Sequence, residues 1–409
     1  MRLLITIVVS VLLLGCLGQN SEVKSRFTTE EILSMNLDST RNLIVDDNSI
    51  TKIDLNSFLK VRQFDYTSLI RNAVFIPLET TNESLITIIE SIIATDFYIY
   101  IIDKYQGGNV LIFNKNGDFI KRIRKGEGPE EILDLKSVDF DQSNQELIVY
   151  HNRFFSFFTT EGDFKRKEKL PLNGSEFAVT PNGYLFYVPT GFSNEHLGVR
   201  HNDMVYITDK KFELKYTGLL DFVSKDNNFE NRTYLNIHDN KVNFTKKFTD
   251  TVYQYIDDNK VKIKYALDIS DKKLPDRVIN QPFELFWKEA GQNDYYYFMG
   301  QYIENDTHDF FELENKFLKR STVIFRDKAS GNLQGGSSMK IDIKILPPFW
   351  YPIASQGSSF ISYFNPYNVP KDNLYLSENE SISEDQKRIL KGLKDDDNPV
   401  LVFFELNNF

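Results

Sequence analysis

The sequence predicts an all-β fold: a six-bladed β-propeller with four-stranded antiparallel blades, in a ring closed by N- and C-terminal strands. Short strand patterns separated by turn residues recur along most of the chain. Gly117-Asp118-Phe119 and Gly162-Asp163-Phe164 repeat the same turn 45 positions apart. A further strand pattern, 399–406, lies at the extreme C-terminus. Repeats of this length with several strands each are typical of propeller blades.

The first predicted blade contains strand patterns at 97–103, 110–113 and 119–123. Its second turn holds Asn116-Gly117, which favours a hairpin because both residues accept positive φ. The same order recurs at 147–150, 154–158 and 164–166, at 183–188, 204–207 and 212–215, and at 241–244, 250–255 and 261–264. Residues 284–345 can hold a fifth blade, and residues 349–364 begin a sixth. An all-β sandwich with a chance recurrence of hairpins is the alternative.

Both ends of the chain are expected to complete the ring, since closure removes free sheet edges. The strand pattern at 399–406 and a polar-alternating one at 42–55 are the expected closing strands. Insertions are predicted near 275–294, with a helical turn, and 371–398, with a helix over 383–394. Ser383 and Gln386 are predicted to form a capping box at the start of this helix.

The N-terminus has the pattern of a targeting segment. Leu3–Leu14 is an uncharged apolar run of 12 residues, too short for the roughly 20 that cross a bilayer. Leu13-Leu14-Gly15-Cys16 resembles the lipobox of bacterial lipoproteins, in which the cysteine is lipidated. We therefore expect a signal peptide at 1–15, a lipidated Cys16 with a tether over 16–41, and a propeller at 42–409. The alternative is that Cys16 belongs to a signal peptide cut further on.

Three segments carry a wider resemblance: Phe75–Thr80, Lys125–Glu131 and 397–402. Together with the lipobox they resemble the six-bladed β-propeller lipoproteins of Gram-negative gut bacteria, relatives of NHL-repeat proteins. This resemblance implies a cell-envelope protein anchored to the membrane by lipid, expected at the outer membrane and facing either the periplasm or the surface. It implies no established activity.

Composition excludes several functions. A net charge of −10 argues against nucleic-acid binding, and a single cysteine excludes a disulfide framework and any multi-cysteine metal site. The five histidines lack zinc-site spacing, and no Gly-x-Ser-x-Gly elbow occurs. Asp139-x-Asp141 places two carboxylates on one side of a strand but offers too few oxygens for a hard cation. We therefore expect no cofactor and no metal, and we name no catalytic residue.

Aromatic residues in the last third of the chain are the predicted ligand-binding groups, because exposed aromatic faces stack on sugars and anchor interfaces. They are Trp287, Tyr295, Tyr296, Tyr297, Trp350, Tyr351, Tyr363 and Tyr367. Blade cores also need aromatic residues, which is the alternative use of this set. The expected function is non-catalytic binding of a glycan, peptide or envelope protein, or a scaffold role. The alternative is a propeller hydrolase or lyase with channel-facing carboxylates.

Overall fold

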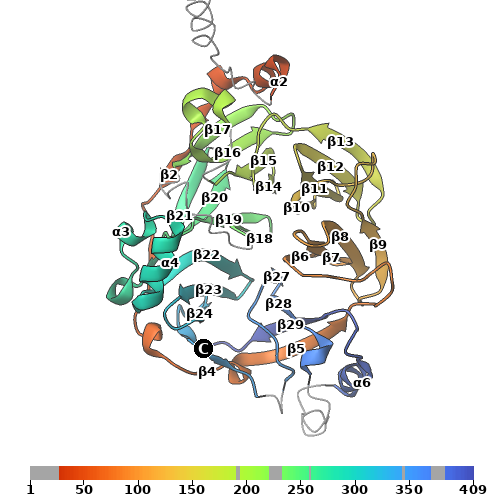
Figure 1. Cartoon of the computed structure of the whole chain (residues 1–409), viewed down its shortest axis with the longest axis vertical. Coiled ribbons are helices and arrows are strands. Elements are labelled where there is room, and N and C mark those ends of the chain that lie inside the picture. The colour runs from red at the N-terminus through yellow and green to blue at the C-terminus, as the bar shows by residue number, and fades with distance from the viewer. Residues whose placement is uncertain (1–26, 190–193, 221–232, 258, 343–345, 370–382) are drawn as a thin grey trace, which may run out of the picture.

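The computed structural model describes residues 27–189, 194–220, 233–257, 259–342, 346–369 and 383–409. Cys16, the predicted signal peptide and residues 371–382 of the second predicted insertion therefore lie outside the described residues. The described chain forms antiparallel sheets set around a common axis (Figure 1). They make a six-bladed β-propeller with four-stranded blades, which confirms the fold class predicted from the sequence.

Each blade runs from the axis outward in chain order, except the last. Blade I is β6 (Ser91–Ala94), β7 (Tyr98–Asp103), β8 (Asn109–Asn114) and β9 (Phe119–Ile123). Blade II is β10 (Leu135–Asp141), β11 (Glu146–His151), β12 (Phe154–Thr159) and β13 (Phe164–Lys169). Blade III is β14 (Glu176–Thr180), β15 (Gly183–Tyr187), β16 (Asp203–Asp209) and β17 (Leu214–Leu220). Blade IV is β18 (Leu235–His238), β19 (Lys241–Thr245), β20 (Thr251–Asp257) and β21 (Lys260–Asp268). Blade V is β22 (Tyr297–Glu304), β23 (His308–Asn315), β24 (Arg320–Asp327) and β25 (Leu333–Gly336).

Blade VI closes the ring with strands from both ends of the chain. It is β27 (Ala354–Gln356), β28 (Ser359–Phe364), β29 (Val400–Leu406) and β5 (Ile70–Pro77). β29 pairs with β28 and also with β5, where Val402 faces Phe75. The closing N-terminal strand is therefore β5, and the expectation that 42–55 supplies it was wrong. Phe75 is fully buried in the core between blades V and VI, whereas Ile44 is 53% exposed and pairs with Lys260 on the outer strand of blade IV.

Residues 27–69 form a belt outside the ring, seen along the left margin of Figure 1. The belt contains α2 (Thr29–Ser34), β1 (Arg41–Asn42), β2 (Ile44–Asp46), β3 (Thr51–Asp54) and β4 (Phe64–Asp65). β1 pairs in parallel with β17, β2 and β3 with β21, and β4 with the short β26 (Met339–Lys340). The belt thereby covers the outer edges of blades III and IV, which would otherwise expose unpaired backbone groups.

The predicted tether is folded over its second half. Phe27 stacks on His196 with ring centroids 3.8 Å apart, and Met35 is fully buried against blades II and III. Thr28 and Glu31 form a capping box that starts α2. Residues 27–41 are therefore part of the packed protein, because their apolar side chains find a partner on the ring.

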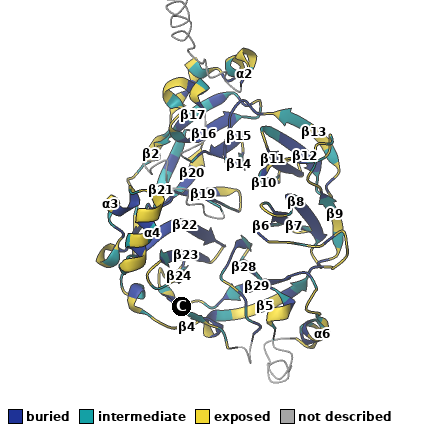
Figure 2. Cartoon of the chain, in the orientation of Figure 1, coloured by how far each residue is buried: buried dark blue, intermediate teal, exposed yellow. Residues whose placement is uncertain are grey.

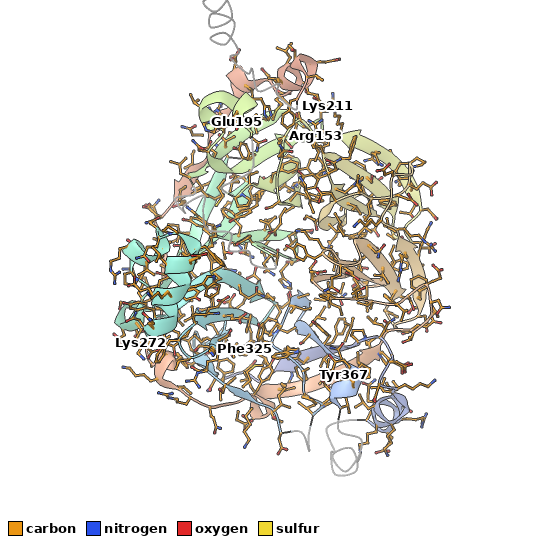
Figure 3. The ribbon with its side chains drawn as sticks, viewed as in Figure 1. Arg153, Glu195, Lys211, Lys272, Phe325 and Tyr367 are labelled. Atoms are coloured by element: carbon orange, nitrogen blue, oxygen red, sulfur yellow. The ribbon has the colours of Figure 1, made fainter. Side chains whose placement is uncertain are left out.

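The hydrophobic core is divided among the interfaces between blades. Each of six buried clusters joins two neighbouring blades of the described chain. Phe325 of blade V packs edge-on against Phe360 of blade VI at 5.8 Å, and Phe155 of blade II packs against Phe177 of blade III at 4.4 Å. Figure 2 shows the buried residues concentrated in the strands of the ring, and Figure 3 shows Phe325 inside it. Many of the phenylalanines therefore hold blades together.

Helices occupy both predicted insertions. The first holds α3 (Asp276–Ile279) and α4 (Phe283–Gln292), and the second holds α6 (Glu384–Gly392). Ser383 caps α6 by accepting the Gln386 N–H at 3.3 Å. The reciprocal half of the predicted capping box is replaced, because the Gln386 side-chain oxygen accepts the Phe75 N–H at 2.6 Å. This bond attaches α6 to the outer edge of blade VI. The short 3-10 helices are η1 (Leu37–Ser39), η2 (Phe58–Lys60), η3 (Thr67–Leu69), η4 (Glu195–Arg200), η5 (Ser270–Lys272) and η6 (Pro366–Asn368).

Candidate functional site

The inner strands of the six blades enclose a channel on the axis of the ring. Its volume is about 810 Å³, and residues of every blade line it. The lining combines hydroxyl, amide, ionisable and aromatic side chains, so apolar groups do not plug it. A cavity of this size with a few polar groups on rigid strands is the expected form of a ligand site.

Asp139, on inner strand β10, connects blade II to blade III. Its carboxylate accepts the Phe140 N–H at 2.8 Å and the Val179 N–H of β14 at 2.7 Å. Burial disfavours the charged form and raises the pKa of Asp139 to about 7, although the two N–H groups favour that form. The sequence placed Asp139 and Asp141 on one side of the strand, and both are buried.

Glu176, at the start of β14, connects blade III to blade IV in the same way. Its carboxylate accepts the Tyr234 N–H at 3.0 Å, the Leu235 N–H at 3.2 Å and the Thr233 hydroxyl at 2.6 Å. Burial raises the pKa of Glu176 despite these donors. Asp139 and Glu176 thus each satisfy backbone donors on the neighbouring blade, which is a structural role.

A hydrogen-bonded relay crosses blades IV, V and VI at the channel wall. We call His238, Asp306 and Ser355 the His238 relay. The His238 Nε2 lies 2.8 Å from Asp306 Oδ1, and its Nδ1 lies 3.4 Å from Ser355 Oγ. The Ser355 hydroxyl donates to the Glu304 carbonyl oxygen at 2.6 Å. His238 is buried, whereas the Asp306 side chain is 51% exposed. All three side chains line the channel.

The turn that carries Asp306 is hydrogen-bonded to the turn that follows β27, the strand that carries Ser355. Fully buried Asn305 accepts the His308 N–H at 2.7 Å and donates to the Ser358 carbonyl oxygen at 2.8 Å. The Asp306 N–H donates to the Gly357 carbonyl oxygen at 3.0 Å. These bonds fix blade V against blade VI and hold the relay on a rigid support.

Glu304, whose carbonyl oxygen accepts the Ser355 hydroxyl, is also the centre of an ion cluster. The Glu304 carboxylate contacts the ammonium group of Lys264 and lies 3.0 Å from that of Lys328. It also accepts the Asn243 amide at 2.7 Å. Burial opposes ionisation of Glu304, but the two lysines outweigh it and lower its pKa to about 2. Burial lowers the pKa of Lys264, while the nearby carboxylates oppose that shift. The cluster fixes Glu304, whose backbone holds Ser355.

The first four aromatic residues predicted as ligand contacts lie on blade V and its helical insertion. Trp287 of α4 is half-buried, and the Lys316 ammonium lies 3.8 Å from the centre of one of its rings. Trp287 and Tyr295 both pack against a small hydrophobic cluster that includes Phe248 and Phe286. Tyr296 is fully buried and donates to the Leu59 carbonyl oxygen at 3.0 Å, and Tyr297 is 4% exposed. These two residues serve the alternative use, core packing.

The other four lie on blade VI and the segments that flank β28. Tyr351 stacks on Phe310 at 5.8 Å, and Tyr363 packs against the core between blades VI and I. Trp350 is 61% exposed and Tyr367 is 62% exposed. Figure 3 shows Tyr367 near α6. None of the eight lines the channel, and their role in ligand binding stays a prediction.

Sequence reasoning missed the His238 relay because its members are far apart in the chain. His238 lies 68 positions from Asp306 and 117 from Ser355. His238 and Ser355 lie on short strands and Asp306 lies between two strands, and none of the three belongs to a recognisable sequence motif. In the part of the chain that the structure describes, no three or more His, Cys, Asp or Glu residues gather as metal ligands. Among the same residues, no helix is apolar and long enough to cross a membrane.

The ring and its open polar channel define the protein as a six-bladed β-propeller with a candidate ligand site on its axis. Residues 50–405 match DUF4934, a domain of unknown function, and the chain belongs to this family. No curated protein matches the sequence.

The chain is similar to several solved structures. A Bacteroides fragilis protein described as exported has a TM-score of 0.70 at 17% identity, covering 88% of this chain and 100% of that chain. A gluconolactonase of Xanthomonas campestris has a TM-score of 0.39 at 13% identity, covering 83% and 92%. An extracellular domain of a two-component system of B. thetaiotaomicron has a TM-score of 0.34 at 11% identity, covering 65% and 30%. The first similarity supports the propeller fold, and the likeness to NHL repeats stays a prediction.

Proposed function

We propose that the protein is a cell-envelope lipoprotein, anchored through Cys16, that binds a glycan in its channel. The observation that carries this proposal is the chemistry at one end of the channel. Phe97, on the turn after β6, is 67% exposed and lines the channel. The exposed amides of Gln142, Gln145 and Asn240 line the same end. Sugars are bound by aromatic faces that stack on the ring and by planar amides that bond to hydroxyls.

The bonding of two channel carboxylates, Asp139 and Glu176, favours binding over a hydrolase or lyase that would use them. Asp139 and Glu176 direct acceptor oxygens to backbone N–H groups of the next blade. A general acid or base must instead reach the substrate within hydrogen-bond distance. The exposed aromatics Trp350 and Tyr367 favour a second candidate, a scaffold that contacts an envelope protein through blade VI.

Binding is tested by screening the purified full chain on a glycan array and titrating each positive glycan by calorimetry. Phe97→Ala should weaken binding about fivefold, because one stacked ring contributes roughly 1 kcal/mol. Tyr105→Ala is the matched control, since Tyr105 is 58% exposed and lies outside the channel lining. An array without any positive glycan, or equal binding by the two variants, would exclude the proposal.

The anchor has a separate test. Cys16→Ala should block lipidation and move the protein out of the membrane fraction, because several acyl chains together provide stable attachment. Fractionation of cells that express each form measures this. Unchanged membrane attachment of the variant would exclude a lipid anchor at Cys16.

A further inference from the structure

We propose that the His238 relay is a nucleophilic site that hydrolyses acyl esters in the channel, with Ser355 as the nucleophile. This activity goes beyond glycan binding, and its test is independent of that proposal. The relay joins a hydroxyl, an imidazole and a carboxylate in series along one wall of an open cavity. Acyl transfer by serine uses the same three groups in the same order.

The hydrogen bonds determine which nitrogen of His238 can act as a base. An ionised carboxylate only accepts hydrogen bonds, so Asp306 at 2.8 Å holds the proton of neutral His238 on Nε2. The lone pair of Nδ1 then faces Ser355 Oγ at 3.4 Å. Asp306 is thus a positioning residue, which sets the tautomer and stabilises the imidazolium that forms when the serine reacts.

The Ser355 hydroxyl can reach this base without movement of heavy atoms. Its proton bonds to the Glu304 carbonyl oxygen at 2.6 Å in the structure. Rotation about the Cβ–Oγ bond redirects the proton to Nδ1 of His238. A separation of 3.4 Å is long for a hydrogen bond, and such contacts are often loose before the substrate binds.

Each step conserves atoms and charge. Ser355 Oγ attacks the ester carbonyl carbon while its proton passes to His238 Nδ1. The carbon–oxygen bond to the alcohol then breaks, and the alcohol leaves with that proton. Water next attacks the acyl-serine and gives a proton to His238, which returns it to Ser355 as the carboxylic acid departs. Water is the only co-reactant.

The experiment uses the full chain, purified in detergent, with two probes. A fluorophosphonate should label Ser355, located by mass spectrometry of the digested protein, and p-nitrophenyl acetate should be hydrolysed. Ser355→Ala should abolish both reactions, while Ser91→Ala, which alters another channel-lining serine, should retain them. His238→Gln should slow labelling by about a hundredfold, the contribution expected of a general base. Asp306→Asn should lower the rate and alter its pH profile, whereas Asp306→Glu should restore part of it.

Ser355→Cys provides a second test that does not depend on Ser355→Ala folding correctly. Its thiol beside His238 should react with iodoacetamide faster than the thiol of Ser91→Cys, because a neighbouring imidazole favours the thiolate. Absence of labelling at Ser355, wild-type turnover by Ser355→Ala, or an unchanged pH profile in Asp306→Asn would each overturn the proposal. Glycan titration of the wild-type protein separates the two ideas, since glycan binding by a wild-type protein that neither labels at Ser355 nor hydrolyses the ester refutes the activity alone.

Discussion

Asp139→Asn tests whether a buried channel carboxylate couples stability to pH. Asp139 is 5% exposed, and burial raises its pKa from 3.8 to about 7. The unfolded chain therefore releases this proton at lower pH than the folded chain does. Between about pH 4 and 7 this carboxyl is more protonated in the native state than in the unfolded state, so its contribution to the stability of the wild-type protein falls as pH rises.

The pKa difference fixes the magnitude of the effect. A rise from 3.8 to about 7 corresponds to about 4 kcal/mol, at 1.36 kcal/mol for each pH unit. Asparagine has no charge to desolvate, so Asp139→Asn removes this pH dependence. The Asp139 carboxylate accepts hydrogen bonds from the N–H groups of Phe140 and Val179. In the variant, the asparagine NH₂ group faces one of these donors, and the lost bond costs about 1–2 kcal/mol at every pH.

Urea denaturation followed by fluorescence, at intervals from pH 4 to pH 8, measures the outcome. The variant should be about 1–2 kcal/mol less stable than the wild type at pH 4 and about 2–3 kcal/mol more stable at pH 8. Asp141→Asn is the matched control, two residues along the same strand. Burial opposes ionisation of Asp141, but Asn144 and Lys210 outweigh it and lower its pKa below 3.8. The loss of stability in Asp141→Asn should therefore stay nearly constant from pH 4 to pH 8, because this carboxyl titrates below that range in both states. A difference between Asp139→Asn and wild type that is constant across this range would refute the reasoning.

Three further predictions concern the joints of the ring, each measured by urea denaturation. Glu304→Gln should destabilise the protein by about 3–5 kcal/mol at pH 7, because it leaves two partly buried lysines, Lys264 and Lys328, without the buried carboxylate between them. This difference should shrink as pH falls from about 4.5 toward about 2, and a pH-independent difference would contradict it. Asn398→Ala should lower the free energy of unfolding by about 3 kcal/mol, because it removes three side-chain hydrogen bonds between blades VI and I, to the backbone of Glu79, Ser84 and Ile86. A loss below about 1 kcal/mol would count against this role. Gly117→Ala should lower the free energy of unfolding by at least about 2 kcal/mol. Gly117 has φ 91°, and a Cβ added there would lie 2.1 Å from the Pro77 carbonyl oxygen. A variant as stable as the wild type would contradict this prediction of strain.

The strands and turns of the ring were accessible from the sequence because they depend on neighbouring residues. Asn116-Gly117 predicted a hairpin, and Gly117 does adopt positive φ between β8 and β9. Ser383 predicted the start of α6, and the pattern at 399–406 became β29. The recurrence of the same turn 45 positions along the chain then indicated that the hairpins belong to the repeated blades of a ring.

The candidate site was only partly accessible. Alternation placed Asp139 on the same side of its strand as Asp141, but the bond of Asp139 to Val179 depends on the approach of another blade. The aromatic residues of 287–297 were recognisable as a group. Their placement in a core or on a surface, such as fully buried Tyr296 against half-buried Trp287, follows from packing with elements distant in the chain.

The sequence by itself determined the fold class and the order of the blades, because periodicity and short motifs are encoded locally. Lipid attachment at Cys16 stays a prediction. The tertiary structure alone decided that β5 closes the ring, that residues 27–69 form the belt, and that His238, Asp306 and Ser355 meet. The physical reason is that a propeller brings its inner strands together on one axis. Residues more than a hundred positions apart become neighbours there, and no local pattern encodes which of them will touch.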